Sequence, residues 1–332
     1  MFTRPDDLTD EEVVATLAGG WGLEAARVEY AAVGYGSHHW RITANSIYWF
    51  VSADDLDARR RDVTESREHA RNRLCAALTV ARSLFDAGMD FVIAPTLTTA
   101  GQVLQLISDR YVMALYRQVE GETHEWGPYP TRRDRFAVLD LVIAVHRVNS
   151  NIAGSAMRDD FAIPSRDQLV DALSDPEMPW GPGPYAGQAR DLLHGHRDAL
   201  ERVLHHYDQL AGHAAARPER LVLTHGEPHR GNTINTATGV VLIDWDTALL
   251  APPERDLWTL IEEDHEIAED YAHRTGTPVD DVVVRMYRLW WDLREIALFA
   301  ADLRRPHDDT EDTRVAWEKF TLHLDPTRWQ DR

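Results

Sequence analysis

The chain has 332 residues, which is enough for one or two domains with a large hydrophobic core. Its 55 acidic residues outnumber its 35 basic residues, giving a formal net charge of −20, and Lys319 is the only lysine in the sequence. This charge balance argues against binding to nucleic-acid phosphates or to an anionic lipid surface. An enzyme that needs a catalytic lysine would have only Lys319 to offer.

The sequence predicts a cytoplasmic protein that is soluble, with no membrane partner, and it leaves the oligomeric state open. Cys75 is the only cysteine, so no intrachain disulfide can form. The N-terminal stretch is acidic where a signal peptide needs a basic end and an apolar run. The longest apolar stretch, residues 136–145, is interrupted by Asp140 and is too short to span a membrane.

The first third of the chain has the pattern of a strand-rich region. Thr9 and Glu12 have capping-box spacing, which predicts a helix that stops at the glycine pair 19–20. Three short strands are then predicted at residues 27–33, 38–44 and 47–53, with turns at 34–36 and 45–46. A long helix over residues 61–87 follows, and further strands are predicted at residues 91–96, 102–108 and 111–118.

The remainder of the chain has mostly helical periodicity. Helices are predicted over residues 131–148, 186–216, 254–274, 279–304 and 310–322. One strand–loop–hairpin segment, residues 221–246, interrupts them. We therefore predict a strand-rich nucleotide-binding lobe over residues 1–118 and a helical lobe over residues 119–332, which carries the loop of this segment and the acceptor site.

The interrupting segment carries the polar residues with the most informative spacing. It reads LVLTHGEPHRGN over residues 221–232 and ends IDWD at residues 243–246. We call residues 225–232 the central loop. Turn residues at 235–239 predict a hairpin, and pairing about Thr238 sets residue 233 opposite 243 and 234 opposite 242. Asn232 and Asp244 then emerge together at the open end, which suits Mg²⁺ because this ion prefers oxygen ligands.

Two other interpretations fit parts of this segment. His225 and His229 are four residues apart, a spacing that brings two zinc ligands together on a helix. Gly226 and Pro228 stand between them, and the proline excludes a regular helical turn, so zinc is the weaker interpretation. Ordinary turn chemistry explains Asn235 well but not the whole strand–loop–hairpin arrangement.

The combined segment resembles the aminoglycoside phosphotransferase family, which has a protein-kinase-like fold. The continuation LAPPERDL, residues 250–257, looks similar to spectinomycin-type antibiotic phosphotransferases in particular. The resemblance covers most of the chain. It implies an α+β, bilobal fold with a strand-rich N-lobe and a mostly helical C-lobe. It also implies transfer of a phosphoryl group from ATP or GTP to a hydroxyl, with Mg²⁺ on the phosphates.

The resemblance implies a role for each residue that matches the motif. Glu227 would orient or deprotonate the attacking hydroxyl, and Asn232 and Asp244 would hold Mg²⁺. His225 would brace the central loop, and Asp256 would accept hydrogen bonds from its backbone. The family usually has aspartate where this chain has Glu227, and the extra methylene shifts the carboxylate by about a bond length.

A second departure concerns the phosphate-binding lysine. Kinase-like N-lobes carry a lysine on the third strand, and Ser52 stands about where it is expected here. A charged hydrogen bond contributes about 1.5–3 kcal/mol, so another cation is expected to compensate. Arg41 on the second strand and Arg230 in the central loop are the candidates. Glu65 and Glu68 could replace the usual lysine partner, although a solvated helix face explains both.

The nucleotide site is expected at the first predicted turn and at the linker between the lobes. Glycines let a backbone approach phosphates, although a plain hairpin turn explains the same residues. The resemblance places adenine against the linker. Apart from the two candidate arginines, the expected nucleotide-binding residues are Gly34, Gly36, Ser37, His38, Gln118 and Val119.

The acceptor is expected to be a small molecule that bears a hydroxyl group and is possibly cationic. Carboxylates beside tryptophans can bind an amino sugar through charge and ring contact. A solvated helix face and a core aromatic pair explain the same residues. The candidates are Glu262, Glu263, Asp264, Trp290, Asp292 and Glu295.

We therefore predict a kinase that phosphorylates an antibiotic, either an aminoglycoside, an aminocyclitol or another natural product, and so confers resistance. A metabolite kinase acting on a sugar or an amino alcohol is one alternative. A catalytically impaired kinase-like binding protein is the alternative from a different class, motivated by the absent lysine and by the glutamate in place of the usual aspartate. The presence of Glu227, Asn232 and Asp244 argues against it.

Overall fold

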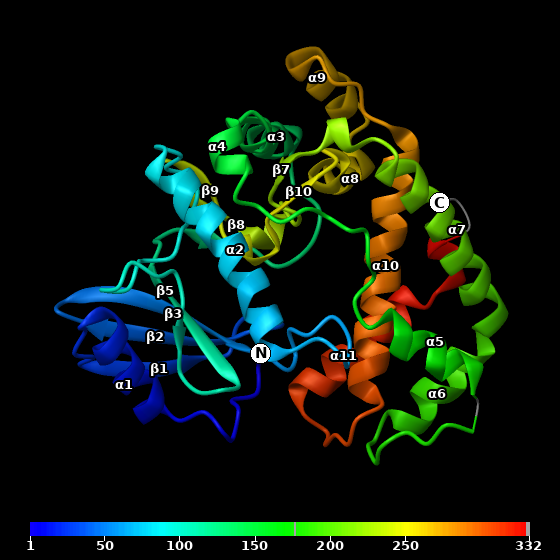
Figure 1. Ribbon diagram of the computed structural model, residues 1–332, viewed down its shortest axis with the longest axis horizontal. Coiled ribbons are helices and arrows are strands. Elements are labelled where there is room, and N and C mark those ends of the chain that lie inside the picture. Colours follow the sequence, from blue (N-terminus) through cyan, green and yellow to red (C-terminus); the bar gives the residue numbers. More distant parts are fainter. Residues whose placement is uncertain (176, 330–332) are drawn as a thin grey trace. The chain divides into compact units, whose positions relative to one another are not determined.

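The computed structural model describes residues 1–175 and 177–329, and the chain forms two units. Unit 1 comprises Met1–Arg59, Ser66–Asp159 and Arg220–Val279. Unit 2 comprises Arg60–Glu65, Asp160–Glu219 and Asp280–Arg332. Figure 1 follows the chain through both units in sequence colours. Each unit is therefore assembled from three segments that are separated in the sequence.

Unit 1 begins with an antiparallel sheet in the order β1-β2-β3-β5-β4. Its strands are β1 (Arg27–Ala31), β2 (His38–Ala44), β3 (Ile47–Asp55), β4 (Gln105–Leu106) and β5 (Tyr111–Arg117). The strand predicted at residues 91–96 is wrong, because the backbone there forms just an isolated bridge from Val92 to Leu242. The strand predicted at residues 102–108 is reduced to β4.

Helices cover both faces of this sheet (Figure 1). On one face, α1 (Asp10–Trp21) buries Val13 and Leu17 against strand residues that include Met113. On the other face, α2 (Arg67–Asp86) buries Leu74 and Leu78 against Val112. Met113 and Val112 are neighbours on β5 and point to opposite faces, as the period of two in a strand requires.

The predicted capping box of α1 is confirmed, but its predicted end is wrong. Thr9 and Glu12 exchange both capping bonds. The helix continues through the glycine pair because Gly20 is buried, and it ends where Gly22 adopts a left-handed conformation with φ of 65°. The next helix, α2, starts at Arg67 instead of residue 61, since the Ser66 side chain caps it by accepting from the backbone N–H of His69.

Unit 1 also contains the helices and short strands that surround the central loop. The helices are α3 (Arg132–His146), α4 (Ser150–Ala153), α8 (Glu254–Glu263) and α9 (Glu266–Thr275). The strands are β6 (Glu122–Thr123), β7 (Val222–Thr224), β8 (Thr233–Thr236), β9 (Gly239–Leu242) and β10 (Leu249–Ala251). The helix predicted over residues 254–274 is broken, because Asp264 has an extended backbone with φ of −158°.

The predicted hairpin forms, with a register that differs by one residue. Thr233 lies opposite Leu242, and Thr236 lies opposite Gly239, so a two-residue turn joins the strands. The prediction of pairing about Thr238 assumed a three-residue turn. Gly239 has φ of 140°, a conformation that glycine adopts easily, and this allows the tighter connection.

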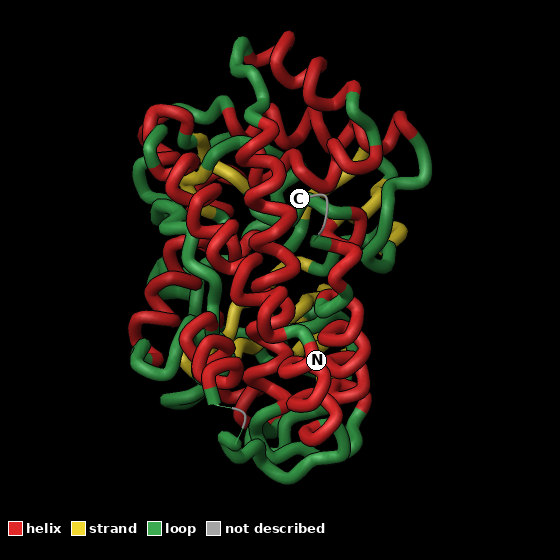
Figure 2. Tube along the Cα trace, turned by 90° about the vertical axis from the view of Figure 1, so that its right-hand side faces the viewer, coloured by secondary structure: helices red, strands yellow, loops and turns green. Residues whose placement is uncertain are grey.

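Unit 2 is helical in the part of the chain that the structure describes. Its helices are α5 (Arg166–Ser174), α6 (Ala186–Gly195), α7 (Arg197–Ala215), α10 (Asp281–Leu303) and α11 (Glu311–His323). The helix α10 packs against α5, α7 and α11. The helix predicted over residues 186–216 is two helices, which are separated at His196. Helices and loops make up most of the trace in Figure 2.

Two further predictions concern the lobe boundary and membrane-spanning helices. The last residue of β5, Arg117, lies next to the predicted lobe boundary at residue 118. The two units divide the chain at other positions. The lobes 1–118 and 119–332 therefore stay a prediction. Across residues 1–175 and 177–329, none of the helices has the length and apolar character that crossing a membrane requires.

Candidate active site

The central loop begins at His225, a fully buried residue at the end of β7. One ring nitrogen, Nε2, lies 2.9 Å from the backbone oxygen of Ile243, and the other, Nδ1, accepts from the backbone N–H of Glu227 at 3.2 Å. Burial lowers the pKa of His225, which favours the neutral ring that these two contacts require. Both nitrogens are engaged within the protein, so the geometry favours a bracing role over zinc binding.

Asp256 holds the backbone of the central loop from α8. Its carboxylate accepts from the N–H groups of His225 at 2.9 Å and Gly226 at 2.6 Å, and it lies 3.1 Å from Nε2 of His146. Burial alone would raise the pKa of Asp256, but the hydrogen bond and charge of His146 lower it below the ordinary value. This side chain is fully buried, and its bonds to the loop backbone are those that the family resemblance implies.

Gly226 adopts a conformation that excludes other residues. Its φ is 103°, and a Cβ atom added there would lie 2.4 Å from Nη1 of Arg255. That guanidinium group is buried and donates to Oγ1 of Thr224 and to the backbone oxygen of Thr247, at 2.9 Å each. The loop therefore needs glycine at this position for both backbone and packing reasons.

Glu227 and Asn232 lie at opposite ends of the central loop and are joined by a hydrogen bond. Nδ2 of Asn232 donates to the backbone oxygen of Glu227 at 3.0 Å. Oε2 of Glu227 lies 3.8 Å from Nε2 of His229, whose ring meets the ring of Trp126 edge-on at 6.0 Å. Trp126 is 52% exposed, so a partly exposed indole lies beside His229.

Asp244 follows β9 and lies one position beyond the residue that pairs with Asn232. The backbone N–H of Ile243 donates to the oxygen of Asn232 at 3.0 Å, and Asp244 then adopts a left-handed conformation with φ of 65°. Desolvation by the surrounding protein, followed by the charges of Asp246 and Glu227, raises the pKa of Asp244 well above its ordinary value.

This crowding of carboxylates fits a divalent cation. Asp244 keeps solvent access, and the bond from Nδ2 of Asn232 leaves its Oδ1 as a ligand atom. A cation between these oxygens would offset the repulsion from Asp246 and Glu227. Mg²⁺ accepts such a partial set of oxygen ligands because water and phosphate oxygens complete its shell.

A cluster around Arg59 completes the geometry, and the sequence did not predict it. Arg59 contacts Asp54 through Nη2 at 2.6 Å and through Nε at 3.0 Å, and Nη2 also donates to Oγ of Ser37 at 3.1 Å. Its Nη1 forms an ion pair with Asp246. Burial alone would lower the pKa of Arg59, but Asp246 and Asp54 raise it well above its ordinary value.

The model of the phosphotransferase enzyme family (APH) matches residues 92–299, more than half of the chain. The chain belongs to this family. The predicted resemblance is confirmed, and so is the predicted enzyme class, a phosphotransferase with an alcohol group as acceptor.

Individual relatives agree with the APH assignment. The protein StrN of Streptomyces griseus is 31% identical over 263 residues, which cover 76% of this chain and 77% of StrN. The spectinomycin phosphotransferase APH(9)-Ia has a TM-score of 0.72 at 15% identity, covering 97% of this chain and 100% of that one. Choline kinase LicA from Streptococcus pneumoniae has a TM-score of 0.58 at 14% identity, covering 95% of this chain and 98% of that one. These structures confirm the predicted protein-kinase-like α+β fold.

The expected nucleotide-binding residues of this APH chain lie in different surroundings. Ser37 is buried in the Arg59 cluster, and the neighbouring His38 is buried with its Nδ1 3.1 Å from the hydroxyl of Tyr30. Arg41 is exposed on β2, where it pairs in register with Glu29 of β1. The structure therefore brings Ser37, but not Arg41, to the carboxylates of the site.

The remaining expected nucleotide-binding residues lie at the turn, the central loop and the linker. Gly34 and Gly36 have φ of 70° and 101°, as a tight turn between strands requires. Arg230 contacts Nδ1 of His124 at 3.3 Å. The backbone N–H of Gln118 bonds to the oxygen of Tyr48, and Gln118 and its neighbour Val119 keep solvent access.

The absent lysine and its expected partners also have defined positions. Ser52 is half-buried on β3. Glu65 accepts from the backbone N–H of Arg61 at 2.6 Å, and Glu68 is exposed in the first turn of α2. These contacts agree with ordinary helix-face and turn roles for the two glutamates.

The expected acceptor residues are divided between the two units. In unit 1, Glu262 is exposed at the end of α8, and Asp264 lies 3.5 Å from Arg132 and from Arg135. The side chain of Glu263 lies outside the described residues. In unit 2, Nε1 of Trp290 donates to the backbone oxygen of Ala162, and Glu295 pairs with Arg294 at 2.8 Å.

Asp292 requires a correction to the predicted acceptor role. It is fully buried inside unit 2. Its Oδ1 lies 2.7 Å from Nδ1 of His323 and 2.9 Å from Nε of Arg328, so the carboxylate ties α10 to the C-terminal part of the described chain. A buried carboxylate with these partners has no surface to offer an acceptor.

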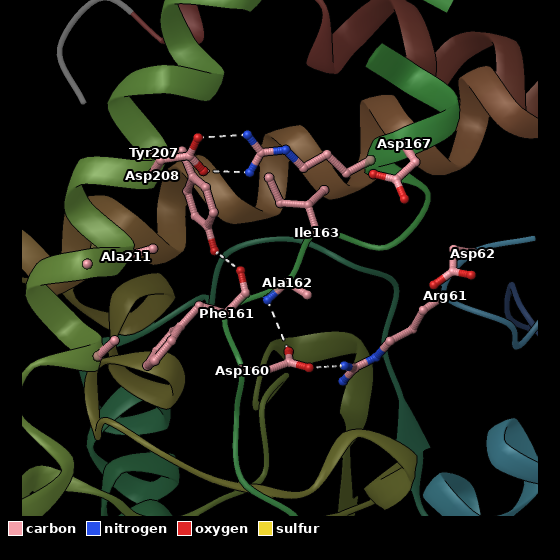
Figure 3. Close-up of a pocket in the computed structure, with 13 residues that line it drawn as sticks. Arg61, Asp62, Asp160, Phe161, Ala162, Ile163, Asp167, Tyr207, Asp208 and Ala211 are labelled. Atoms are coloured by element: carbon pink, nitrogen blue, oxygen red, sulfur yellow. Dashed lines mark hydrogen bonds and ion pairs between the residues drawn. The ribbon is translucent and has the colours of Figure 1, made fainter. Parts of the chain in front are cut away.

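Unit 2 also contains a pocket of about 540 Å³ (Figure 3). Arg61 points toward Asp160 at 2.6 Å, and Tyr207 donates to the backbone oxygen of Phe161 at 2.5 Å. Asp208 is bonded to Arg166 at 2.5 Å. The described lining residues include none of the predicted acceptor residues, so this pocket gives no support to that set.

Proposed function

We propose that this protein is a small-molecule kinase that transfers the γ-phosphate of ATP or GTP to a hydroxyl of an antibiotic, and so confers resistance. The acceptor is an aminoglycoside, an aminocyclitol or another natural product. The observation that carries the proposal is the convergence of Glu227, Asn232 and Asp244 at one end of the β8–β9 hairpin. We place the reaction in the cytoplasm, where nucleoside triphosphates are available.

The roles of the chain's residues follow from what phosphoryl transfer needs, which is mainly positioning and charge neutralisation. Glu227 would accept the proton of the attacking hydroxyl, or orient that hydroxyl toward the phosphate. Oδ1 of Asn232 and the carboxylate of Asp244 would hold Mg²⁺, which when bound neutralises the charge that develops on the phosphates. His225 and Asp256 would keep the central loop in the conformation that presents Glu227.

The nature of the acceptor is supported by charge and by the related structures. The net charge of −20 favours a cationic acceptor over an anionic one. The spectinomycin phosphotransferase APH(9)-Ia was crystallised with ADP and spectinomycin, which supports a nucleotide donor and an antibiotic acceptor.

A kinase for an amino alcohol is the second candidate. Choline kinase LicA shares the fold, and an ammonium group on a small alcohol also suits an acidic protein. Both candidates use the same chemistry at Glu227, so the acceptor itself decides between them.

The test is a screen for phosphate transfer by mass spectrometry. The purified protein would be incubated with Mg²⁺, ATP or GTP, and a panel of aminoglycosides, spectinomycin, other natural products, choline and ethanolamine. We expect an antibiotic to gain one phosphate group. The Glu227→Gln variant should lose about 10²- to 10⁴-fold in turnover, whereas Glu11→Gln on the exposed start of α1 should leave turnover unchanged.

Three outcomes would contradict parts of this proposal. Phosphorylation of choline or ethanolamine alone would favour the amino-alcohol kinase. Nucleotide binding that depends on Mg²⁺ without transfer to any acceptor would favour the binding-protein alternative. Full activity of the Glu227→Gln variant would show that the base is assigned to the wrong residue.

A further inference from the structure

The absence of a lysine at Ser52 leaves the nucleotide phosphates without their expected cation, and Arg59 is an arginine that contacts Asp54, two residues beyond Ser52. We propose that Arg59 binds the phosphates of the nucleotide in place of that lysine, and that Asp54 anchors its guanidinium group. This inference rests on the proposed use of a nucleotide, but it does not depend on which acceptor is phosphorylated.

The position of Arg59 is defined by contacts with three parts of unit 1. Ser37, the donor to Oδ1 of Asp54 at 2.7 Å, belongs to the turn that would cover the phosphates. Asp54 lies near the end of β3, two residues beyond Ser52, and on the same face of that strand. Asp246 lies two residues beyond the proposed metal ligand Asp244. The guanidinium group therefore lies between the covering turn and the metal-binding residues.

The chemistry of the guanidinium group suits this role. Nε and Nη2 are held by Asp54, which fixes the plane of the group. Nη1 reaches Asp246, and it is the nitrogen for which a phosphate oxygen would compete. A cation held by Asn232 and Asp244 would offset the charge of the nearby carboxylates, and Asp246 would then release this nitrogen to a phosphate oxygen more easily. Arginine presents its donors in a planar fork that matches phosphate, so it is a chemically suitable substitute for lysine.

The two arginines expected from the sequence are less well placed. Arg41 is exposed, and Arg230 is directed to His124. A structural ion-pair role is the remaining alternative for Arg59, because a guanidinium group between Asp54 and Asp246 also neutralises two carboxylates. Ligands that differ in the number of phosphate groups distinguish phosphate binding by Arg59 from a purely structural ion pair.

The experiment measures equilibrium binding of adenosine, AMP, ADP and a non-hydrolysable ATP analogue in the presence of Mg²⁺. For Arg59→Gln we expect the affinity for ADP and the ATP analogue to fall about 10- to 100-fold, while that for adenosine changes less than about 2-fold. The matched control is Arg67→Gln, which removes an exposed ion pair with Asp57 and should change none of these affinities. Unchanged ADP affinity, or an equal loss for adenosine and ADP, would overturn the proposal.

A second measurement covers the case in which Arg59→Gln does not fold. In the wild-type protein, the ¹⁵Nε resonance of Arg59, assigned with Arg59→Lys, should shift on addition of ADP with Mg²⁺ and not on addition of adenosine. A resonance that does not respond to ADP would contradict phosphate binding by Arg59.

The failure of this inference can be told apart from failure of the proposed function. In one outcome, Arg59→Gln weakens the binding of ADP but not of adenosine, and the wild-type protein phosphorylates no acceptor. That outcome would support phosphate binding by Arg59 and contradict the proposed acceptor class. In the opposite outcome, the wild-type protein phosphorylates an antibiotic and Arg59→Gln has unchanged affinity for ADP. That outcome would support the proposed function and contradict phosphate binding by Arg59. A wild-type protein that binds no nucleotide would overturn both.

Discussion

The side-chain amide of Asn232 donates to the backbone oxygen of Glu227 at 3.0 Å. One side chain thus serves two elements of the site, since its remaining oxygen is a proposed metal ligand and its nitrogen positions the residue proposed as the base. The proposed ligand oxygen of Asn232 and the backbone of Glu227 are therefore positioned by one side chain. Errors of about an ångström in such an arrangement can cost about 10²-fold in rate.

Asn232→Asp is expected to separate these two functions. The new carboxylate keeps an oxygen for the metal but cannot donate to Glu227, so we expect turnover to fall about 10²-fold. The loss of nucleotide affinity should be smaller than the loss of turnover. Steady-state kinetics and equilibrium binding would measure both. Asn235→Asp makes the same chemical change at an exposed position of β8, and similar losses in that variant would argue against a specific role for Asn232.

Asp244→Asn should stabilise the protein without nucleotide while abolishing turnover. The pKa of Asp244 is raised, so the folded state binds a proton more readily than the unfolded state, and its ionised form at neutral pH opposes folding. Asparagine also tolerates the left-handed backbone at this position. Because solvent screens this carboxylate, we expect a gain of at most about 1 kcal/mol in the free energy of unfolding.

Thermal unfolding checks the prediction for Asp244. Mg²⁺ with an ATP analogue should raise the unfolding temperature of the wild-type protein, since a ligand that binds only the folded state stabilises it. The Asp244→Asn variant should show a much smaller increase. A variant that is less stable without nucleotide, or equally stabilised by the Mg²⁺ complex, would contradict the proposed role.

Because of Asp256, the free energy of unfolding should fall as the pH is lowered into the acid range. Its pKa is lowered in the folded state from an ordinary value of 3.8. Its contribution is therefore complete above that value and is lost as the pH falls through the folded-state pKa. Asp256→Asn removes the negative charge that the two loop N–H groups and His146 face. We expect the free energy of unfolding to fall by about 2–4 kcal/mol near neutral pH.

Urea unfolding between neutral and acid pH measures this effect. The difference in stability between the wild-type protein and Asp256→Asn should shrink as the pH falls below about 4, because the carboxylate is protonated first in the unfolded state and at lower pH in the folded state. A difference that stays constant down to the acid limit would show that Asp256 acts through packing rather than through its charge.

Trp126 is expected to contact the acceptor, because its half-exposed indole lies beside His229 and hence close to Glu227. For a cationic acceptor, Trp126→Ala should raise the acceptor KM by about 2- to 30-fold, the range of a cation–π contact. The nucleotide affinity should not change. The control is Tyr48→Ala, because Tyr48 is also an exposed aromatic residue but lies on β3. An unchanged acceptor KM would remove Trp126 from the site.

The sequence predicted those parts of the fold and site that depend on residues close together in the chain. The central loop and Asp244 lie within one short segment, so their spacing alone was informative. The capping box of α1 depends on two residues three apart, and it is confirmed. Helix breaks such as the one at His196 were missed because both flanking helices continue the same apolar periodicity.

Arg59 shows why the rest of the site could not be predicted. Three consecutive arginines, Arg59, Arg60 and Arg61, follow β3, and no local pattern distinguishes the first from the others. Its partner Asp246 is 187 positions away, so the pair exists only through the tertiary fold. The same holds for Trp126, whose contact with His229 requires the pairing of β6 with β8.

The discontinuous make-up of unit 1 has a consequence for protein synthesis. The sheet strands emerge from the ribosome first, but Asp246, which pairs with Arg59, and Asp256, which holds the central loop, come more than a hundred residues later. Contacts of such long sequence separation slow folding. A nascent chain halted before residue 221 would therefore present Arg59 without Asp246, its partner in the finished protein. Synthesis past Val279 supplies the last segment of unit 1.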